Sequence, residues 1–133
     1  MFIAYRAMEE RMMHALTEAG YDITLAQARV FQRIAPGGSR LTDLAEQAQI
    51  TKQSAGFLVE ALERAGFVRR EPDPTDARAR LVTVAPRGQE AVDAARTVVD
   101  EILAEWTRHL GARRMRAFTD ALVSLREITD PYR

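Results

Sequence analysis

Apolar residues recur at steps of three and four in three long stretches, one at the start of the chain and two over its last third. Such steps place apolar side chains on one stripe of an α-helix, so we expect helices over residues 1–19, 86–109 and 112–128. Each stripe is narrow, as in helices that pack against another helix. The stripes consist of Tyr5, Met8, Met12 and Ala15; of Val92, Ala95, Val99, Ile102 and Trp106; and of Met115, Phe118, Leu122 and Leu125.

Between these stretches, start and stop signals predict three shorter helices. Thr24 begins a capping-box pattern, so a helix should start there and run to about Ala35, before a Pro-Gly-Gly-Ser break. A second helix is expected to open at Thr42. Thr51 has the side chain of an N-cap, and we expect it to begin a third helix over Lys52–Ala65 that stops at a glycine.

After residue 66 the apolar period changes from helical to extended. Phe67–Glu71 and Ala79–Val84 are rich in Val, Phe and Leu, which favour strands. They flank the run P-D-P-T-D-A, in which Pro72 and Pro74 remove backbone donors and stiffen the chain. We therefore expect a β-hairpin with a long tip rather than a tight two-residue turn.

A helix, a turn, a second helix and an arginine-bearing hairpin thus follow one another between residues 41 and 88. This is the order of a winged helix-turn-helix, whose second helix fits the major groove of DNA. An arginine on a slim hairpin can reach a narrow minor groove. The expected fold class is mainly α with a small β-hairpin wing.

Composition narrows the protein class. The chain has 133 residues, enough for one domain with a modest core, and 29% of them are charged. It carries no apolar run long enough to span a bilayer and no signal peptide, so we expect a soluble cytoplasmic protein. The absence of cysteine excludes a thiol redox sensor, and two separated histidines argue against a transition-metal site. No cofactor is expected.

Charge supports nucleic-acid binding only weakly. The formal net charge is zero. Residues 51–88 hold seven basic and five acidic side chains, a local balance of 7 − 5 = +2, which by itself would not suggest DNA. Lys52, the only lysine in the chain, stands at the start of the predicted recognition helix.

The stretch I-T-K-Q-S-A-G-F-L-V-E-A-L-E-R-A-G-F-V-R-R-E-P-D-P-T-D-A-R-A-R-L-V-T-V-A-P-R-G, residues 50–88, resembles the MarR (multiple antibiotic resistance regulator) family of bacterial transcription factors. The resemblance implies that Asp76 orients the wing arginine, that Arg78 enters the minor groove, and that Arg80 contacts the DNA backbone. Ala77 departs from the family, which often has an arginine there. It also implies DNA contacts from the start of the recognition helix, at Thr51, Lys52, Gln53, Ser54 and Phe57.

The resemblance also implies the domain organisation. One domain spans residues 1–133, with a DNA-binding lobe at 24–88 and a helical dimerisation region at 1–20 and 89–133. The three narrow apolar stripes agree with a dimer interface built from both chain ends, although packing within one chain is the alternative. A twofold dimer would place two recognition helices on a palindromic operator.

The family further implies a ligand-responsive repressor. Its members often bind small aromatic or phenolic anions between the helical region and the DNA-binding lobe. The candidate effector contacts in this chain are Tyr5, Met12, His14, Arg29 and Phe31.

Two other functional classes fit the sequence less well. Catalysis has little support, because the sequence contains neither a Gly-rich phosphate loop nor a nucleophile triad nor a metal triad. A winged helix that binds proteins, as an adaptor or antirepressor without DNA contact, fits the zero net charge and Ala77. Lys52, Arg78 and Arg80 argue against it.

Overall fold

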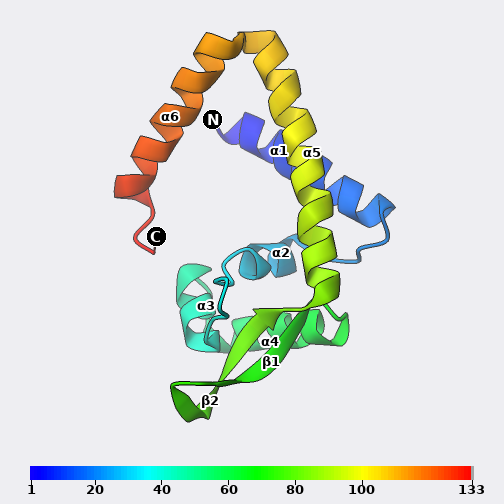
Figure 1. The fold of residues 1–133 in the computed structure, drawn as a ribbon, viewed down its shortest axis with the longest axis vertical. Coiled ribbons are helices and arrows are strands. Elements are labelled where there is room, and N and C mark those ends of the chain that lie inside the picture. Colours follow the sequence, from blue (N-terminus) through cyan, green and yellow to red (C-terminus); the bar gives the residue numbers. More distant parts are fainter. Residues whose placement is uncertain (133) are drawn as a thin grey trace. The chain divides into compact units, whose positions relative to one another are not determined.

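The computed structural model describes residues 1–132, and within them the fold is mainly α with one small β-hairpin, as the sequence predicts (Figure 1). The chain divides into two compact units, residues 1–95 and residues 96–133. Its elements are α1 (Phe2–Glu18), α2 (Leu25–Phe31), α3 (Leu41–Gln47), α4 (Lys52–Arg64), β1 (Val68–Asp73), β2 (Asp76–Val84), α5 (Pro86–Leu110) and α6 (Ala112–Thr129).

The first unit is built around the buried side of α4. Val59 and Leu62 are fully buried, and they share a core with Leu44 of α3, Val30 of α2 and Phe67 at the start of the hairpin. Burying a side chain of this size contributes about 1.5–3 kcal/mol. The core therefore determines which face of α4 is left for solvent.

Thr24 and Thr51 are confirmed as the N-caps of α2 and α4. The Thr24 side chain accepts a hydrogen bond from the backbone N–H of Gln27, and the Gln27 side chain accepts one from the backbone N–H of Thr24. The hydroxyl of Thr51 accepts a hydrogen bond from the N–H of Ser54. Both caps satisfy backbone donors that a helix start leaves free.

The predicted end of α2 is wrong, because the helix stops at Phe31 and not near Ala35. Helical backbone is disfavoured at a residue that precedes a proline, and Ala35 precedes Pro36. The hydroxyl of Ser39 accepts a hydrogen bond from the N–H of Ala35, and Ser39 forms an isolated β-bridge with Val82. The segment after Phe31 therefore contacts the hairpin and does not continue the helix.

The predicted start of α3 is also displaced. The helix begins at Leu41, and Arg40 takes the N-cap position without a side-chain capping bond. The Arg40 side chain is engaged by the hairpin, as described below.

The prediction of a long hairpin tip is wrong. β1 reaches Asp73 and β2 begins at Asp76, so only two residues join them. The side chain of Asp73 accepts hydrogen bonds from the backbone N–H and hydroxyl of Thr75, which closes the turn. The register shifts between Pro72 and Asp73, so residues 77–79 have no partner on β1. Part of the segment expected to form a long tip therefore lies in a bulge of β2.

The hairpin leads directly into α5. Gly88, in the first turn of α5, is buried against Phe67, and a Cβ at this position would clash with the Phe67 carbonyl oxygen. Pro86 is the first residue of α5, as predicted, where its missing N–H has no cost.

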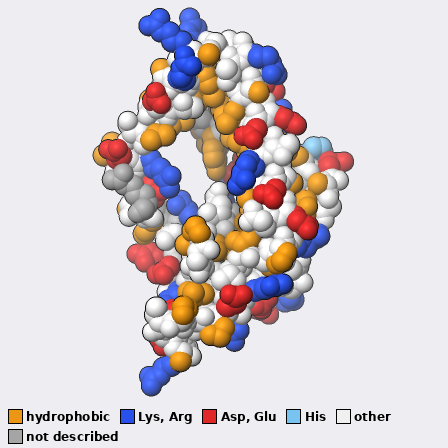
Figure 2. All heavy atoms as spheres, in the orientation of Figure 1, with side chains coloured by type: hydrophobic (Ala, Val, Ile, Leu, Met, Phe, Trp, Pro, Cys, Tyr) orange, Lys and Arg blue, Asp and Glu red, His pale blue; other side chains and the backbone are white. Residues whose placement is uncertain are grey.

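The second unit contains the end of α5 and all of α6. Gly111 links the two helices with a φ of +86°, which glycine adopts without strain. Ile102 and Met115 are buried. Larger apolar side chains of α6 reach the surface (Figure 2), namely Phe118, Leu122, Val123, Leu125 and Ile128.

No helix within residues 1–132 has the length and apolar character needed to cross a membrane.

Candidate nucleic-acid interface

The outward face of α4 carries a short row of side chains that the core does not use. Because Ala55, Val59 and Leu62 are buried, the residues on the opposite side of the helix face solvent. Gln53 and Phe57 are successive members of this row and both are exposed. Glu60 and Arg64 continue it, joined by an ion pair of 3.4 Å. An exposed amide and an exposed aromatic ring thus lie in the first half of α4, and an ion pair lies at its end.

The first turn of α4 is held in place by its cap. The Thr51 hydroxyl accepts the N–H of Ser54 at 3.0 Å and donates to the Ser54 hydroxyl oxygen at 2.9 Å. Lys52, Gln53 and Ser54 are exposed beside it. A cationic side chain and the positive end of the helix dipole therefore lie together at this end, an arrangement that attracts phosphate groups.

The wing is tied to the start of α3 by an ion pair that the sequence analysis missed. Arg40 donates from Nε and Nη2 to one carboxylate oxygen of Asp73, at 3.0 and 2.8 Å. The other oxygen accepts the backbone N–H and hydroxyl of Thr75. Asp73 is buried. Its position in the D-P-T-D motif was visible in the sequence, but its partner lies 33 residues away and no local pattern indicates it.

These hydrogen bonds keep Asp73 ionised. The N–H of Thr75, then its hydroxyl, then Arg40 lower the pKa of Asp73 from 3.8 to about 2. The carboxylate in turn raises the pKa of Arg40 above its usual value.

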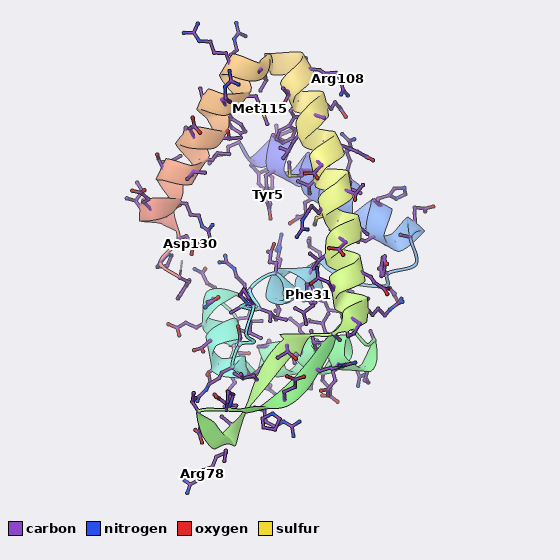
Figure 3. The ribbon with its side chains drawn as sticks, in the orientation of Figure 1. Tyr5, Phe31, Arg78, Arg108, Met115 and Asp130 are labelled. Carbon is purple, nitrogen blue, oxygen red and sulfur yellow. The ribbon has the colours of Figure 1, made fainter. Side chains whose placement is uncertain are left out.

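Asp76 acts on the backbone of Arg78. One oxygen of Asp76 accepts the backbone N–H of Arg78 at 3.0 Å, and the other lies 3.9 Å from Nη2 of Arg40. The Arg78 guanidinium itself has no ion pair within residues 1–132 and extends from the hairpin into solvent (Figure 3). Arg78 lies in the bulge of β2, which turns its side chain away from the strand pair.

Arg80 lies differently from Arg78. Its guanidinium donates to the carbonyl oxygen of Arg70 across the hairpin at 2.8 Å. Of the two predicted wing arginines, Arg78 therefore extends into solvent and Arg80 is held along the hairpin. At the hairpin end of the molecule the outermost side chain is basic, whereas acidic and basic side chains mix over the rest of the face that is shown (Figure 2).

We expect Asp73→Asn to reduce the loss of stability that the protein suffers in acid. The carboxyl of Asp73 has a lower pKa in the folded state than in the unfolded chain. Its stabilising effect is therefore fully present above about pH 4 and disappears as the pH falls towards about 2. Urea unfolding at a series of pH values should give the wild type a higher free energy of unfolding than the variant near neutral pH. The difference should shrink as the pH falls from about 4 to about 2. Asp22→Asn, at an exposed carboxylate, is the control, and an equal pH-dependent difference there would refute the role of Asp73.

A small cavity of about 160 Å³ lies between α1 and α2. The Glu9 carboxylate on its wall accepts the Tyr5 hydroxyl at 2.8 Å and pairs with Arg29 at 3.4 Å. The hydrogen bond to Glu9 raises the pKa of Tyr5. The cavity is lined by Tyr5, Met8, Glu9, Met12, Leu25, Ala28, Arg29 and Gln32.

Three of the five predicted effector contacts, Tyr5, Met12 and Arg29, line this cavity. His14 is exposed and does not line it. Phe31 does not line it either, and packs against the core of the first unit. Sequence reasoning missed Glu9, because its link to Arg29 joins two helices 20 residues apart.

Comparisons with known proteins agree with this arrangement. Residues 21–79 match the sequence pattern of the MarR family. Transcriptional regulator HosA of Escherichia coli O111:H- is 32% identical over 99 residues, which span 73% of this chain and 73% of HosA.

Three solved structures, of two proteins, show the same fold. RV1404 from Mycobacterium tuberculosis has a TM-score of 0.79 at 22% identity, over 96% of this chain and 87% of that one. MepR of S. aureus has TM-scores of 0.70 with bound ethidium bromide and 0.67 as a mutant bound to an oligodeoxyribonucleotide. Both MepR structures are 21% identical and cover 92% of this chain; the match spans 89% of the ethidium-bound chain and 90% of the mutant chain.

Proposed function

Since this chain belongs to the MarR family of transcriptional regulators, we propose that it binds double-stranded DNA sequence-specifically and represses transcription as a homodimer on a palindromic operator. The observation that carries the proposal is the pairing of two free recognition elements in one lobe. The start of α4 exposes polar side chains opposite its buried face, and Arg78 extends unpaired from the bulged wing. The oligodeoxyribonucleotide bound by the MepR mutant supports this reading.

The two elements would read DNA in different ways. α4 would enter the major groove, where Lys52 and Gln53 can bond to guanine and adenine edges. Arg78 would enter the minor groove and respond to its width, and Arg80 would lie near the phosphates. Thr51 and Ser54 would position the first turn of α4, and Asp76 the backbone of Arg78.

A dimer would account for the exposed apolar side chains at both chain ends. Phe2 and Ile3 of α1 are 70% and 75% exposed, and Leu125 of α6 is 45% exposed. A helix that exposes several large apolar groups marks a surface that binds a partner. A second copy of the chain would present the same groups in a twofold interface. The half-sites of the operator would then be centred about 10 base pairs apart, or a multiple of that.

A small aromatic or phenolic effector would bind the cavity between α1 and α2 and release the DNA. Tyr5, Met12 and Arg29 would form its contacts, together with Glu9. His14 and Phe31 do not line this cavity, and their contact with an effector stays a prediction. The ethidium bound by MepR supports a small-molecule effector.

Fluorescence anisotropy with DNA from upstream of the protein's own gene tests the proposal, with random DNA as the control. We expect specific binding that weakens steeply with salt, because phosphate contacts release counterions. A set of aromatic and phenolic compounds, added to the complex, should include one that releases the DNA. Equal weak binding to both DNAs, and no enriched sequence in a selection from random DNA, would contradict the proposal and favour a protein-binding winged helix.

A further inference from the structure

Phe57 is a large aromatic side chain that the fold leaves in water. It is 64% exposed, and between residues 6 and 83 no other large apolar side chain is exposed. The core has no need of it, because Ala55, Val59 and Leu62 on the other side of α4 are fully buried without it. Exposing this much apolar surface is unfavourable, so the position suggests a contact outside the lobe.

The neighbours of Phe57 indicate what that contact is. Gln53 lies one helical turn earlier on the same row, with its amide exposed. Glu60 and Arg64 lie later on the row and neutralise each other. A partner at this surface therefore meets a hydrogen-bonding amide, then an aromatic ring, then no net charge. An apolar protein surface would leave the Gln53 amide without a partner, whereas the DNA major groove offers groups for both.

We propose that Phe57 contacts the C5-methyl group of a thymine in each half-site and so distinguishes thymine from cytosine. This inference rests on the proposed function, because it requires α4 to lie in the major groove. The thymine methyl is the apolar group that base pairs present there, and Phe is among the side chains that contact it. Gln53 can bond to adenine on its N6 and N7 edge.

The spacing of the two side chains predicts the spacing of the two bases. Residues four apart rise about 6 Å along a helix, which is close to two base-pair steps of about 3.4 Å. When α4 follows the groove, the adenine bonded by Gln53 should lie within about two base pairs of the thymine that Phe57 contacts. A half-site selected by the protein should therefore hold two A·T pairs no more than about two base pairs apart.

Deoxyuridine substitution tests the contact, because deoxyuridine pairs like thymidine and lacks only the methyl group. The probe is the DNA that the wild-type protein selects from a random-sequence pool, with each thymine replaced in turn. At one position per half-site, the replacement should weaken wild-type binding about fourfold, the effect of one buried methyl group. The same replacement should not affect Phe57→Ala, because the ring is gone, and Phe57→Leu should keep part of the effect.

The outcomes separate this inference from the proposed function. Selection of a specific sequence whose binding is insensitive to every deoxyuridine would overturn the role of Phe57 and leave the regulator intact. A deoxyuridine effect that persists unchanged in Phe57→Ala would overturn it as well. Failure to select any sequence would overturn both proposals. Circular dichroism of both variants checks that the helical fold is retained, and exposure of the side chain makes a folding defect unexpected.

Discussion

Leu125→Asp is expected to convert the protein from a dimer to a monomer and to weaken operator binding about 100-fold or more. Leu125 lies on α6 and is 45% exposed, so a charge there has little effect on the folded monomer. In a twofold interface the same substitution occurs on both chains and buries two carboxylates, each costly to desolvate. A monomer engages one half-site at a time and loses the gain of simultaneous binding, which is typically about 10²–10⁴-fold.

Sedimentation measures the first effect and fluorescence anisotropy the second. Ser124→Asp is the matched control, because it introduces the same charge at an exposed position one residue away, on the side of α6 that lacks the apolar stripe. We expect this control to dimerise and bind like the wild type. A Leu125→Asp protein that sediments as a dimer and binds the operator normally would remove α6 from the proposed interface.

Arg78→Ala is expected to weaken operator binding about 10- to 100-fold and to reduce the salt dependence of the affinity. The Arg78 guanidinium is exposed and extends from the wing bulge, so its removal leaves the hydrogen bond between its backbone N–H and Asp76 in place. The lost affinity is then the loss of a DNA contact rather than of wing structure. Anisotropy over a series of salt concentrations measures both the affinity and the slope.

Two further variants identify what Arg78 contributes. Arg78→Lys keeps the charge and loses the planar guanidinium, so its binding should lie between wild type and Arg78→Ala, whereas full recovery would show that charge alone attracts the DNA. Arg69→Ala removes an exposed arginine from β1, away from the tip, and should have a much smaller effect. Equal losses for Arg69→Ala and Arg78→Ala would show that the hairpin contributes only general positive charge.

The local features of the fold could be predicted well from the sequence. The starts of α2 and α4 depend on hydrogen bonds between residues three positions apart, at Thr24 and Thr51. Gly66 has a φ of +82° after α4, as its place at the helix end indicates. The buried side of α4 follows from the spacing of its apolar residues, because that spacing decides which side chains leave water together.

Errors occurred where distant segments decide the local geometry. α2 ends early because Ser39 joins Val82 of the hairpin, 43 positions later. The tip is a tight turn because Asp73 bonds both to Thr75 and to Arg40, and the register shift in β2 accommodates the additional residues. A propensity calculated over a few neighbouring residues does not contain these contacts.

By itself the sequence determined the winged helix order, the exposed row at the start of α4 and the presence of an arginine on the wing, since these depend on periodicity, caps and composition of short segments. The tertiary structure alone decided which arginine is free and which is engaged. Arg40 is held by Asp73 and Arg80 by the Arg70 carbonyl, whereas Arg78 is left extended. It also created the cavity beside Glu9, from two helices that meet only in the folded chain. The physical reason is that hydrogen bonds and ion pairs are satisfied by whichever groups the packed core brings within reach, regardless of their separation along the chain.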